Sequence, residues 1–358
     1  MPRKIIFIAL SVLLLVLNSC SSNNTLKDIK SSKPEYEIYA AGENGVIKYV
    51  QIYNLKDLKY KTPSSINLRE IGMYMDDMVA APINKVYCSI YRTSDGSLGK
   101  NLCVLKDGEI EKNVKLNSSV GPNSMISDVE KGKAYVLMAV QPASYNPDGN
   151  VYNIVDSNND SWIKPFYMKG YFWGYDIKDN LIYTVVTSEG LGFQDTPASY
   201  IASIDRETQK INILTKSGMK DSGTDIKISP NNDIDILSGD KIQIYKADGT
   251  FVKEIPLGLK CNKMVINKKG IAYICNDRNN NEPYSGSCVL IFDTNTGKIT
   301  GKIEGFDGCS SLCEKDGFLF VGNHNTGDVS IIDTSTNKKT GDIHLGDIPI
   351  TKLVVCKV

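Results

Sequence analysis

Residues 289–298 read Val-Leu-Ile-Phe-Asp-Thr-Asn-Thr-Gly-Lys, and residues 329–338 read Val-Ser-Ile-Ile-Asp-Thr-Ser-Thr-Asn-Lys. Each stretch is a run of mostly β-branched residues followed by a polar turn, which is typical of a strand that leads into a tight hairpin. The two copies begin forty residues apart. They therefore predict a β unit that is repeated along the chain.

Weaker copies of the same strand end occur at residues 202–210 and 242–249. The last apolar residues of this strand lie 40 to 52 residues apart, at Tyr53, Leu105, Val155, Ile204, Tyr245, Phe292 and Ile332. Between them, short apolar runs are interrupted by Gly, Asn and Asp, and no long segment has the helical period. Seven copies of a four-stranded unit predict an all-β fold, the seven-bladed β-propeller.

The two ends of residues 35–358 complement each other. Residues 35–71 hold about three strands, whereas residues 350–358 form one strand more than the last repeat needs. If this C-terminal strand completes blade one, the ring is closed and no sheet edge remains open. The other six blades are then expected at residues 72–119, 120–169, 170–218, 219–258, 259–305 and 306–349.

The last two repeats resemble the YVTN-type β-propeller repeat family. That family carries a tyrosine-containing strand, a Val-Ile-Asp-Thr strand end and a Gly-x-x-Pro joint. Here Phe-Leu-Phe-Val-Gly-Asn at residues 318–323 stands in place of Tyr-Val-Thr-Asn, and Gly-Asp-Ile-Pro at residues 346–349 matches the joint. The resemblance implies the propeller architecture and no particular chemistry, because fold-forming positions define this family.

The first twenty residues predict export. Arg3 and Lys4 precede thirteen residues in which only Ser11 is polar, too few to cross a bilayer as a helix. Leu-Asn-Ser-Cys at residues 17–20 resembles the lipobox of bacterial lipoproteins, in which the cysteine is acylated. We therefore expect a signal peptide at 1–19, a lipid on Cys20, a flexible tether at 20–34 and a location on the outer face of the cell membrane. The alternative is a plain secretory signal with an incidental cysteine.

Composition argues against several classes of partner. The 41 basic and 41 acidic side chains balance, so no electrostatic footprint for nucleic acid is expected. Only two histidines are present, which disfavours a histidine-rich metal site. No dinucleotide, Walker or HExxH motif occurs, and the sequence predicts neither a cofactor nor a metal.

A ligand is expected on one face of the ring. Long connections between the second and third strands of a blade are predicted at residues 92–100, 141–150, 188–199 and 277–286, on the face where the innermost strands begin. Loops on a rigid scaffold often carry function, although they are also tolerated as plain solvated segments. The predicted ligand-binding residues at this face are Asp76, Arg92, Tyr145, Trp173, Tyr175, Asp225 and Tyr284.

The eight cysteines after Cys20 suggest cross-strand pairs, because an even number in an exported chain favours disulfides. Cys88 and Cys103 are symmetric about Asp95-Gly96, and Cys275 and Cys288 are symmetric about residues 281 and 282. Each pair is expected to face across a hairpin. The alternative is that all eight are small buried residues kept reduced.

These features favour a binding or scaffolding module for an envelope ligand: a cell-wall glycan, a peptide or another envelope protein. The alternative from a different class is a propeller hydrolase, lyase or lactonase that uses channel-mouth carboxylates such as Asp76, Asp77 and Asp225. No catalytic residue is assigned. A purely structural envelope protein is a third interpretation.

Overall fold

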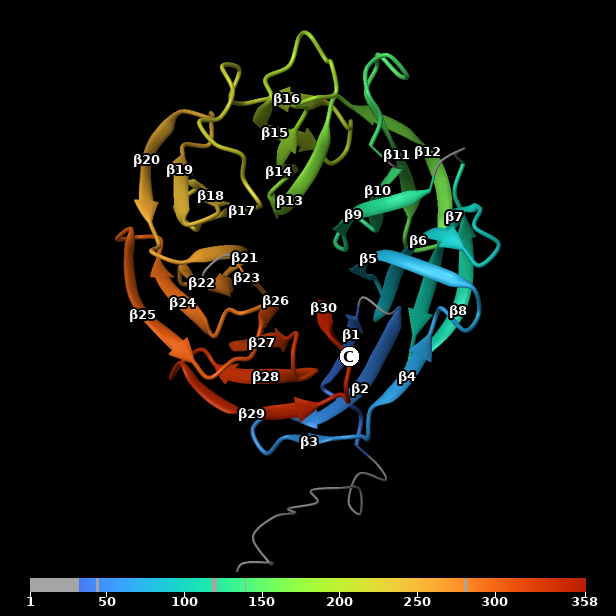
Figure 1. Cartoon of the computed structure of the whole chain (residues 1–358), viewed down its shortest axis with the longest axis vertical. Helices are drawn as coiled ribbons and strands as arrows, with labels where there is room; N and C mark the ends of the chain where they lie inside the picture. The colour runs from blue at the N-terminus through green and yellow to red at the C-terminus, as the bar shows by residue number, and fades with distance from the viewer. Residues whose placement is uncertain (1–31, 43–44, 118–120, 139, 280–281) are drawn as a thin grey trace, which may run out of the picture.

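The computed structural model describes residues 32–358 apart from residues 43–44, 118–120, 139 and 280–281. These residues form seven antiparallel sheets arranged as blades around a central opening (Figure 1). The all-β, seven-bladed propeller predicted from the repeats is therefore confirmed. The expected signal peptide, Cys20 and most of the tether lie outside the described residues. In the described part of the chain, no helix is long and apolar enough to cross a membrane.

The strands of each blade are given in order from the channel outward. Every sheet lies within the sequence range predicted for its blade. Blade two is β5 (Met73–Ala81), β6 (Lys85–Thr93), β7 (Leu98–Lys106) and β8 (Glu109–Lys115). Blade three is β9 (Pro122–Asp128), β10 (Lys133–Met138), β11 (Asn150–Asp156) and β12 (Ser161–Met168). Blade four is β13 (Tyr171–Lys178), β14 (Leu181–Thr187), β15 (Ser199–Asp205) and β16 (Ile211–Ile213).

The later blades repeat this plan. Blade five is β17 (Asp225–Ile228), β18 (Ile234–Ser238), β19 (Lys241–Tyr245) and β20 (Phe251–Pro256). Blade six is β21 (Lys260–Ile266), β22 (Ile271–Asn279), β24 (Cys288–Asp293) and β25 (Lys298–Glu304), with β23 (Glu282–Pro283) paired to β22. Blade seven is β26 (Cys309–Lys315), β27 (Phe318–Asn323), β28 (Asp328–Asp333) and β29 (Lys338–His344).

Blade one joins the two ends of the described chain. Its innermost strand is β30 (Ile350–Lys357), which pairs antiparallel with β1 (Tyr36–Gly42). Next comes β2 (Val46–Asn54), whose outer edge pairs with both β3 (Lys59–Tyr60) and β4 (Ser64–Asn67). Figure 1 shows β30 beside β1, red beside blue. The predicted closure by the C-terminal strand is thus confirmed.

Buried side chains fill the spaces between neighbouring blades. The second strands of blades two, three, four and six carry a tyrosine at the same register. Two of these tyrosines bond to the next blade: Tyr87 donates to Asp160, and Tyr273 donates to Asn337 Oδ1 at 2.8 Å. Blade five departs from this rule. Asp235 on the second strand of blade five pairs with Ile244 on the third strand. Tyr273 pairs with Ile291 at the equivalent position of blade six. A carboxyl group therefore occupies a tyrosine position.

The ring has two different faces. We call the face where the innermost strands begin the loop face, and the opposite one the turn face. Tight turns dominate the turn face, and residues such as Asp107, Asp160 and Asn337 adopt positive φ angles there. Longer connections lie on the loop face, where the backbone N–H of Ala143 donates to the carbonyl of Leu191 at 2.7 Å. The loops of blades three and four are therefore in contact.

Candidate functional site

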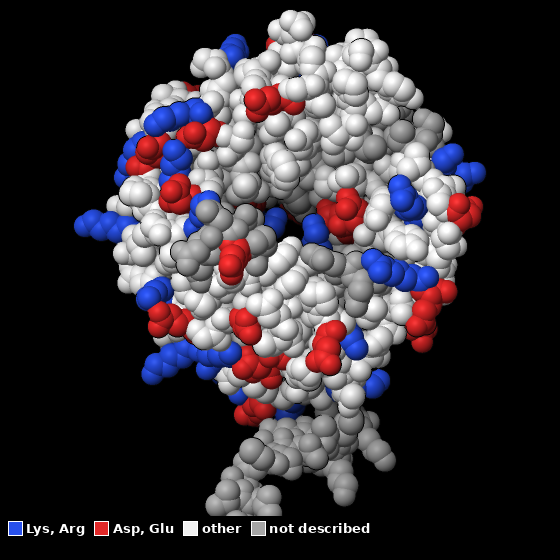
Figure 2. Space-filling model, viewed as in Figure 1, with Lys and Arg blue, Asp and Glu red and all other residues white. Residues whose placement is uncertain are grey.

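The central channel contains a cavity of about 360 Å³. All seven innermost strands line it, so every blade contributes to one site. Figure 2 shows basic and acidic side chains around the central opening of the ring. Among the lining residues are Asp77, Trp173, Tyr175, Asp225, Lys227, Lys263 and Lys352. The cavity is near the lower end of the range of about 300–1,000 Å³ for small-molecule sites.

Two carboxylates in this cavity connect neighbouring blades. Asp77 on β5 accepts the backbone N–H of Met125 on β9 at 2.9 Å, and its other oxygen accepts Lys352 at 2.8 Å. Asp225 on β17 likewise accepts the N–H of Met264 on β21 at 2.9 Å and pairs with Lys227 at 2.9 Å. Each also accepts the N–H of the residue that follows it. Both side chains are therefore held by three donors.

Glycine makes room for one of these connections. A Cβ on Gly174 would lie 2.6 Å from Asp225 Oδ1 and 2.8 Å from Asp225 Cα. The innermost strands of blades four and five thus approach too closely for any side chain at residue 174. Asp176, two residues further along β13, accepts the N–H of Ile228 at 2.7 Å and forms a similar connection.

Asp76 differs from its neighbour Asp77. Its side chain is accessible at the channel mouth, and no hydrogen bond joins it to another described residue. The surrounding walls still remove water from around the carboxyl group. This desolvation raises the pKa of Asp76, the ammonium of Lys352 opposes it, and the charge of Asp77 adds to it.

Lys263 is the third lysine of the cavity and differs from Lys227 and Lys352. No described residue forms a hydrogen bond or ion pair with its ammonium group. Burial lowers the pKa of Lys263, and the nearby ammonium groups of Lys352 and Lys227 lower it further, against Asp225 and Asp77. The cavity thus holds one cation without a direct counter-charge.

Trp173 and Tyr175 supply the aromatic wall, both from β13. The indole N–H of Trp173 donates to Thr187 Oγ1 at 3.0 Å, and Tyr171 packs edge-on against the ring at 5.5 Å. The side chain nevertheless stays 50% exposed. Tyr175 is used in the fold: burial raises its pKa to about 12, and its phenol oxygen accepts the N–H of Ser127 at 3.1 Å.

The three predicted loop residues lie outside the cavity lining. The ring of Tyr284 stacks on His324 with centroids 3.7 Å apart. Asp77 is the main cause of the raised pKa of Lys352, and Tyr284 is the least of the groups that contribute to it. Tyr145 lies in the connection before β11 and is 68% exposed. Arg92 lies on β6, where strand pairing with Leu98 on β7 turns its expected long loop into a hairpin. The structure thus brings Trp173, Tyr175 and Asp225 together in the cavity lining, and it places Asp76 near Lys352 and Asp77 of that lining.

The expected pairing of Cys275 with Cys288 is wrong. The structure joins Cys275 on β22 to Cys309 on β26, with Cα atoms 5.9 Å apart. Strand β22 pairs Cys275 with Val289, so Cys288 is displaced by one residue, and a shift of one residue turns a side chain to the opposite face of a sheet. The disulfide therefore links blades six and seven.

Cys88 and Cys103 face each other across β6 and β7 as expected, but the disulfide suggested for them is not formed. Both are free thiols and fully buried. Burial raises the pKa of Cys103 to about 12 and that of Cys88 well above its usual value. A thiol reacts as its thiolate, so these two groups pack as small apolar residues.

The described part of the chain contains no group of three or more His, Cys, Asp or Glu side chains that could hold a metal ion.

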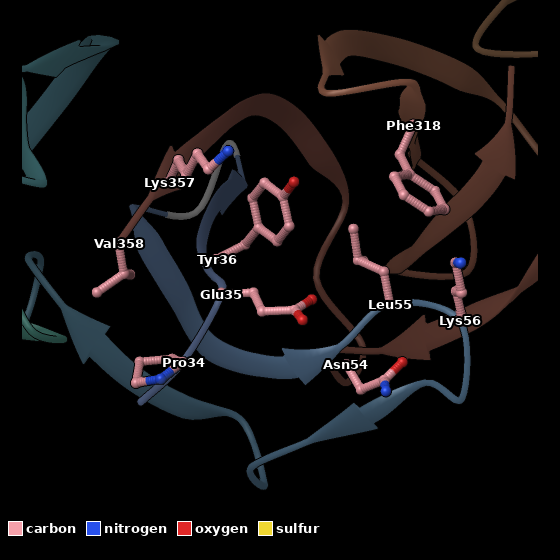
Figure 3. Close-up of a pocket in the computed structure, with 9 residues that line it drawn as sticks. All are labelled: Pro34, Glu35, Tyr36, Asn54, Leu55, Lys56, Phe318, Lys357 and Val358. Atoms are coloured by element: carbon pink, nitrogen blue, oxygen red, sulfur yellow. The ribbon is translucent and has the colours of Figure 1, made fainter. Parts of the chain in front are cut away.

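A second cavity, of about 590 Å³, lies on the turn face between blades one and seven (Figure 3). Pro34 and Glu35 line it beside Lys357 and Val358. The N–H of Glu35 donates to Ile52, and its carbonyl accepts from Val358 at 3.1 Å. The described chain therefore begins at the turn face.

Sequence reasoning missed the three lysines of the channel. Lys227 lies two residues after Asp225, and Lys352 lies on the strand predicted to close the ring, so strand alternation could have found both. Lys263 gave no such signal. Irregularities on either side of Cys261 shift the register of β21 and change which side chains face the channel.

Comparison with known proteins finds similarity in structure but none to a sequence family. No family model matches the chain, and no curated protein matches its sequence. A functionally unknown protein from Desulfotomaculum acetoxidans is similar in structure, with a TM-score of 0.61 and 13% identity over 90% of this chain and 99% of that one. AztD from Citrobacter koseri has a TM-score of 0.53 and 14% identity, over 91% and 88%.

The WD40 β-propeller domain of Doa1 is also similar, with a TM-score of 0.54 and 13% identity over 77% of this chain and 84% of that domain. At identities this low the likeness concerns the fold alone. The protein is a seven-bladed β-propeller whose channel holds paired and unpaired charges.

Proposed function

We propose that this protein is a lipid-anchored, extracytoplasmic binding module that recognises an envelope ligand, a cell-wall glycan, peptide or protein, at its loop face. The observation that carries the proposal is the separation of the two faces. The described chain begins at the turn face, beside Val358, whereas the channel mouth and the longer connections lie on the loop face. A lipid on Cys20 would leave the loop face turned away from the membrane.

The accessible side chains of the loop face suit recognition. Trp173 and Tyr145 expose half or more of their surface, and rigid aromatic side chains contribute large contact areas at a low entropic cost. Tyr284 lies near the same mouth, stacked on His324. These groups come from blades four, three, six and seven, so one ligand could contact several blades.

The carboxylates support binding over hydrolysis. Asp77 and Asp225 each accept three hydrogen bonds from backbone and lysine groups, which leaves little capacity for general acid or base work. Asp76 is the accessible carboxylate with a raised pKa, and hydrolysis of a glycoside usually requires two convergent carboxyl groups. The hydrolase alternative therefore has the weaker support.

The experiment measures the melting temperature of the full-length protein in neutral detergent, with and without isolated cell-wall fragments, a small glycan panel and other envelope fractions. A ligand of the folded state raises the midpoint by mass action. We expect the rise to disappear when Trp173→Ala and Tyr145→Ala are combined. Tyr167→Ala is the matched control, because this exposed tyrosine lies on outer strand β12. A rise that survives the double substitution would place recognition elsewhere and contradict the proposal.

A further inference from the structure

We propose that the channel cavity binds a small organic anion, whose carboxylate or other oxyanion head pairs with Lys263 and whose flat body packs against Trp173. This inference rests on the proposed function, because it specifies the chemical class of the ligand that would enter the channel from the loop face. It commits to a small molecule bound within the ring, so a long neutral glycan or a second protein would be a different outcome.

Of the three lysines in the cavity, only Lys263 has no ion-pair partner among the described residues, so we expect the anion to bind there. Lys352 and Lys227 already have partners, at 2.8 Å from Asp77 and 2.9 Å from Asp225. Backbone N–H groups of the next blade hold these two carboxylates in place, so neither is free to swing toward Lys263. A guest anion would supply the counter-charge that the described residues do not give to Lys263.

The energetic reason is the environment of the ammonium group. A partly desolvated cation is costly until it is paired, and a charge-assisted hydrogen bond is stronger there than at an open surface. The lowered pKa of Lys263 reflects the same cost. An anion that enters the cavity therefore stabilises the charged lysine, and a neutral molecule of the same shape does not.

The aromatic wall of the cavity favours a ligand with a flat ring. Trp173 lines the same cavity, and Tyr171 together with Thr187 fixes the plane of its half-exposed indole. A flat ring can stack on such a surface. The hydroxyl-bearing residues Ser124, Ser311 and Thr351 also line the cavity, among apolar side chains, and can accept or donate further hydrogen bonds. A volume of about 360 Å³ fits a small molecule and excludes a folded peptide.

The test titrates the full-length protein with three probes: benzoate, benzamide and inorganic phosphate. Benzoate has the charge and the ring, benzamide the ring alone, and phosphate the charge alone. Trp162→Phe leaves Trp173 as the single tryptophan of the chain, so its fluorescence reports the cavity directly. We expect benzoate to bind at millimolar concentration about tenfold more tightly than benzamide, with phosphate between them.

Lys263→Met keeps the length of the side chain and removes the charge. We expect it to weaken benzoate binding about tenfold or more and to leave benzamide binding unchanged. Lys298→Met is the matched control in the same blade, because Lys298 is an exposed residue of outer strand β25. Retained circular dichroism and melting temperature of each variant exclude unfolding as the cause.

The outcomes separate the two proposals. Absence of benzoate binding, equal binding of benzamide, or full binding by Lys263→Met each overturns the anion site. If envelope fragments still raise the melting temperature in a manner that depends on Trp173 and Tyr145, the binding module stands and only its assigned ligand class fails. If neither probe nor envelope fragment binds, both proposals fail.

Discussion

At the scale of single residues, Asp225 shows how one side chain serves the ring and the channel together. It joins β17 to β21 through Met264 and neutralises Lys227. The side chain is buried, so the hydrogen bonds that it accepts are largely shielded from water. Removing it leaves the N–H groups of Met264 and Ile226 without this acceptor and the ammonium group of Lys227 without its counter-charge, and each loss carries a desolvation penalty.

We expect Asp225→Ala to lower the free energy of unfolding by about 3 kcal/mol. Urea denaturation followed by circular dichroism measures the change. Glu109→Ala, at an exposed position of outer strand β8, should change it by no more than about 0.5 kcal/mol. Equal effects of the two substitutions would show that the connection between blades five and six contributes little.

Asp235 is a second informative residue, because it occupies a tyrosine position with a side chain only 1% exposed. Burial raises its pKa from 3.8 to about 7, Asp233 adds to the effect, and Lys253 opposes it. Since the folded state holds the proton more tightly than the unfolded state, this group favours folding at low pH. Its contribution falls by about 1.4 kcal/mol for each pH unit between these two pKa values.

Asp235→Asn removes the titration while keeping the shape. We expect the variant to be more stable than the parent at pH 8 by up to about 4 kcal/mol, and the difference to vanish near pH 4. Unfolding curves of both proteins at pH 4, 6 and 8 test this. A difference that is independent of pH would show that Asp235 is not the titrating group.

The residues of the site were only partly predictable. Asp76, Trp173, Tyr175 and Asp225 could be found because they fall near the start of strands that the repeat places at the channel. Lys263 could not, since its direction depends on the irregular pairing around Cys261. Whether a carboxylate has hydrogen-bond partners depends on contacts between blades. The sequence of one strand does not show which residues of the neighbouring blade it contacts.

At the scale of elements, the hairpins were predictable and the connections between sheets were not. Each strand end with its turn is a local signal, so the seven sheets could be placed from the sequence. The disulfide Cys275–Cys309 joins β22 to β26 across two blades, and its partner was assigned wrongly because only the hairpin was considered. Cys309 begins the next blade and lies 34 residues further along.

This disulfide is expected to stabilise the contact between blades six and seven. Replacing both Cys275 and Cys309 by alanine should lower the free energy of unfolding by roughly 2–4 kcal/mol, as for other loops of this length. Peptide mapping under non-reducing conditions checks the pairing. The same measurement with Cys88→Ala and Cys103→Ala should show no change in the map, because these thiols are free.

Strand β30 carries the closure of the ring. Deleting residues 350–358 exposes β1 and removes Lys352 from Asp77. We expect the deleted protein to aggregate or to lose its cooperative melting transition, because the edge of β1 that pairs with β30 becomes open. Limited proteolysis and size-exclusion chromatography measure this. A soluble deletion variant that melts like the parent would refute the closing role of β30.

At the scale of the whole molecule, the proposed anchor gives the ring an orientation. Cys20→Ser is expected to release the protein from the membrane fraction, and a labelled fatty acid should be incorporated only into the parent. In the anchored protein, a cysteine introduced at Tyr145 on the loop face should react with a bulky maleimide faster than one introduced at Asp107 on the turn face. Equal rates at the two positions would contradict the orientation.

The pairing of β1 with β30 also has a consequence for the time at which the protein can fold. A ribosome releases the first strand of blade one more than three hundred residues before the strand that completes it. Until residue 357 has emerged, the first sheet lacks its innermost strand and the channel lacks Lys352. Native contacts between the chain ends are the most distant in sequence and form slowly. The nascent chain therefore cannot complete blade one until β30 has been released, and the export that we propose would act on a chain whose ring is still open.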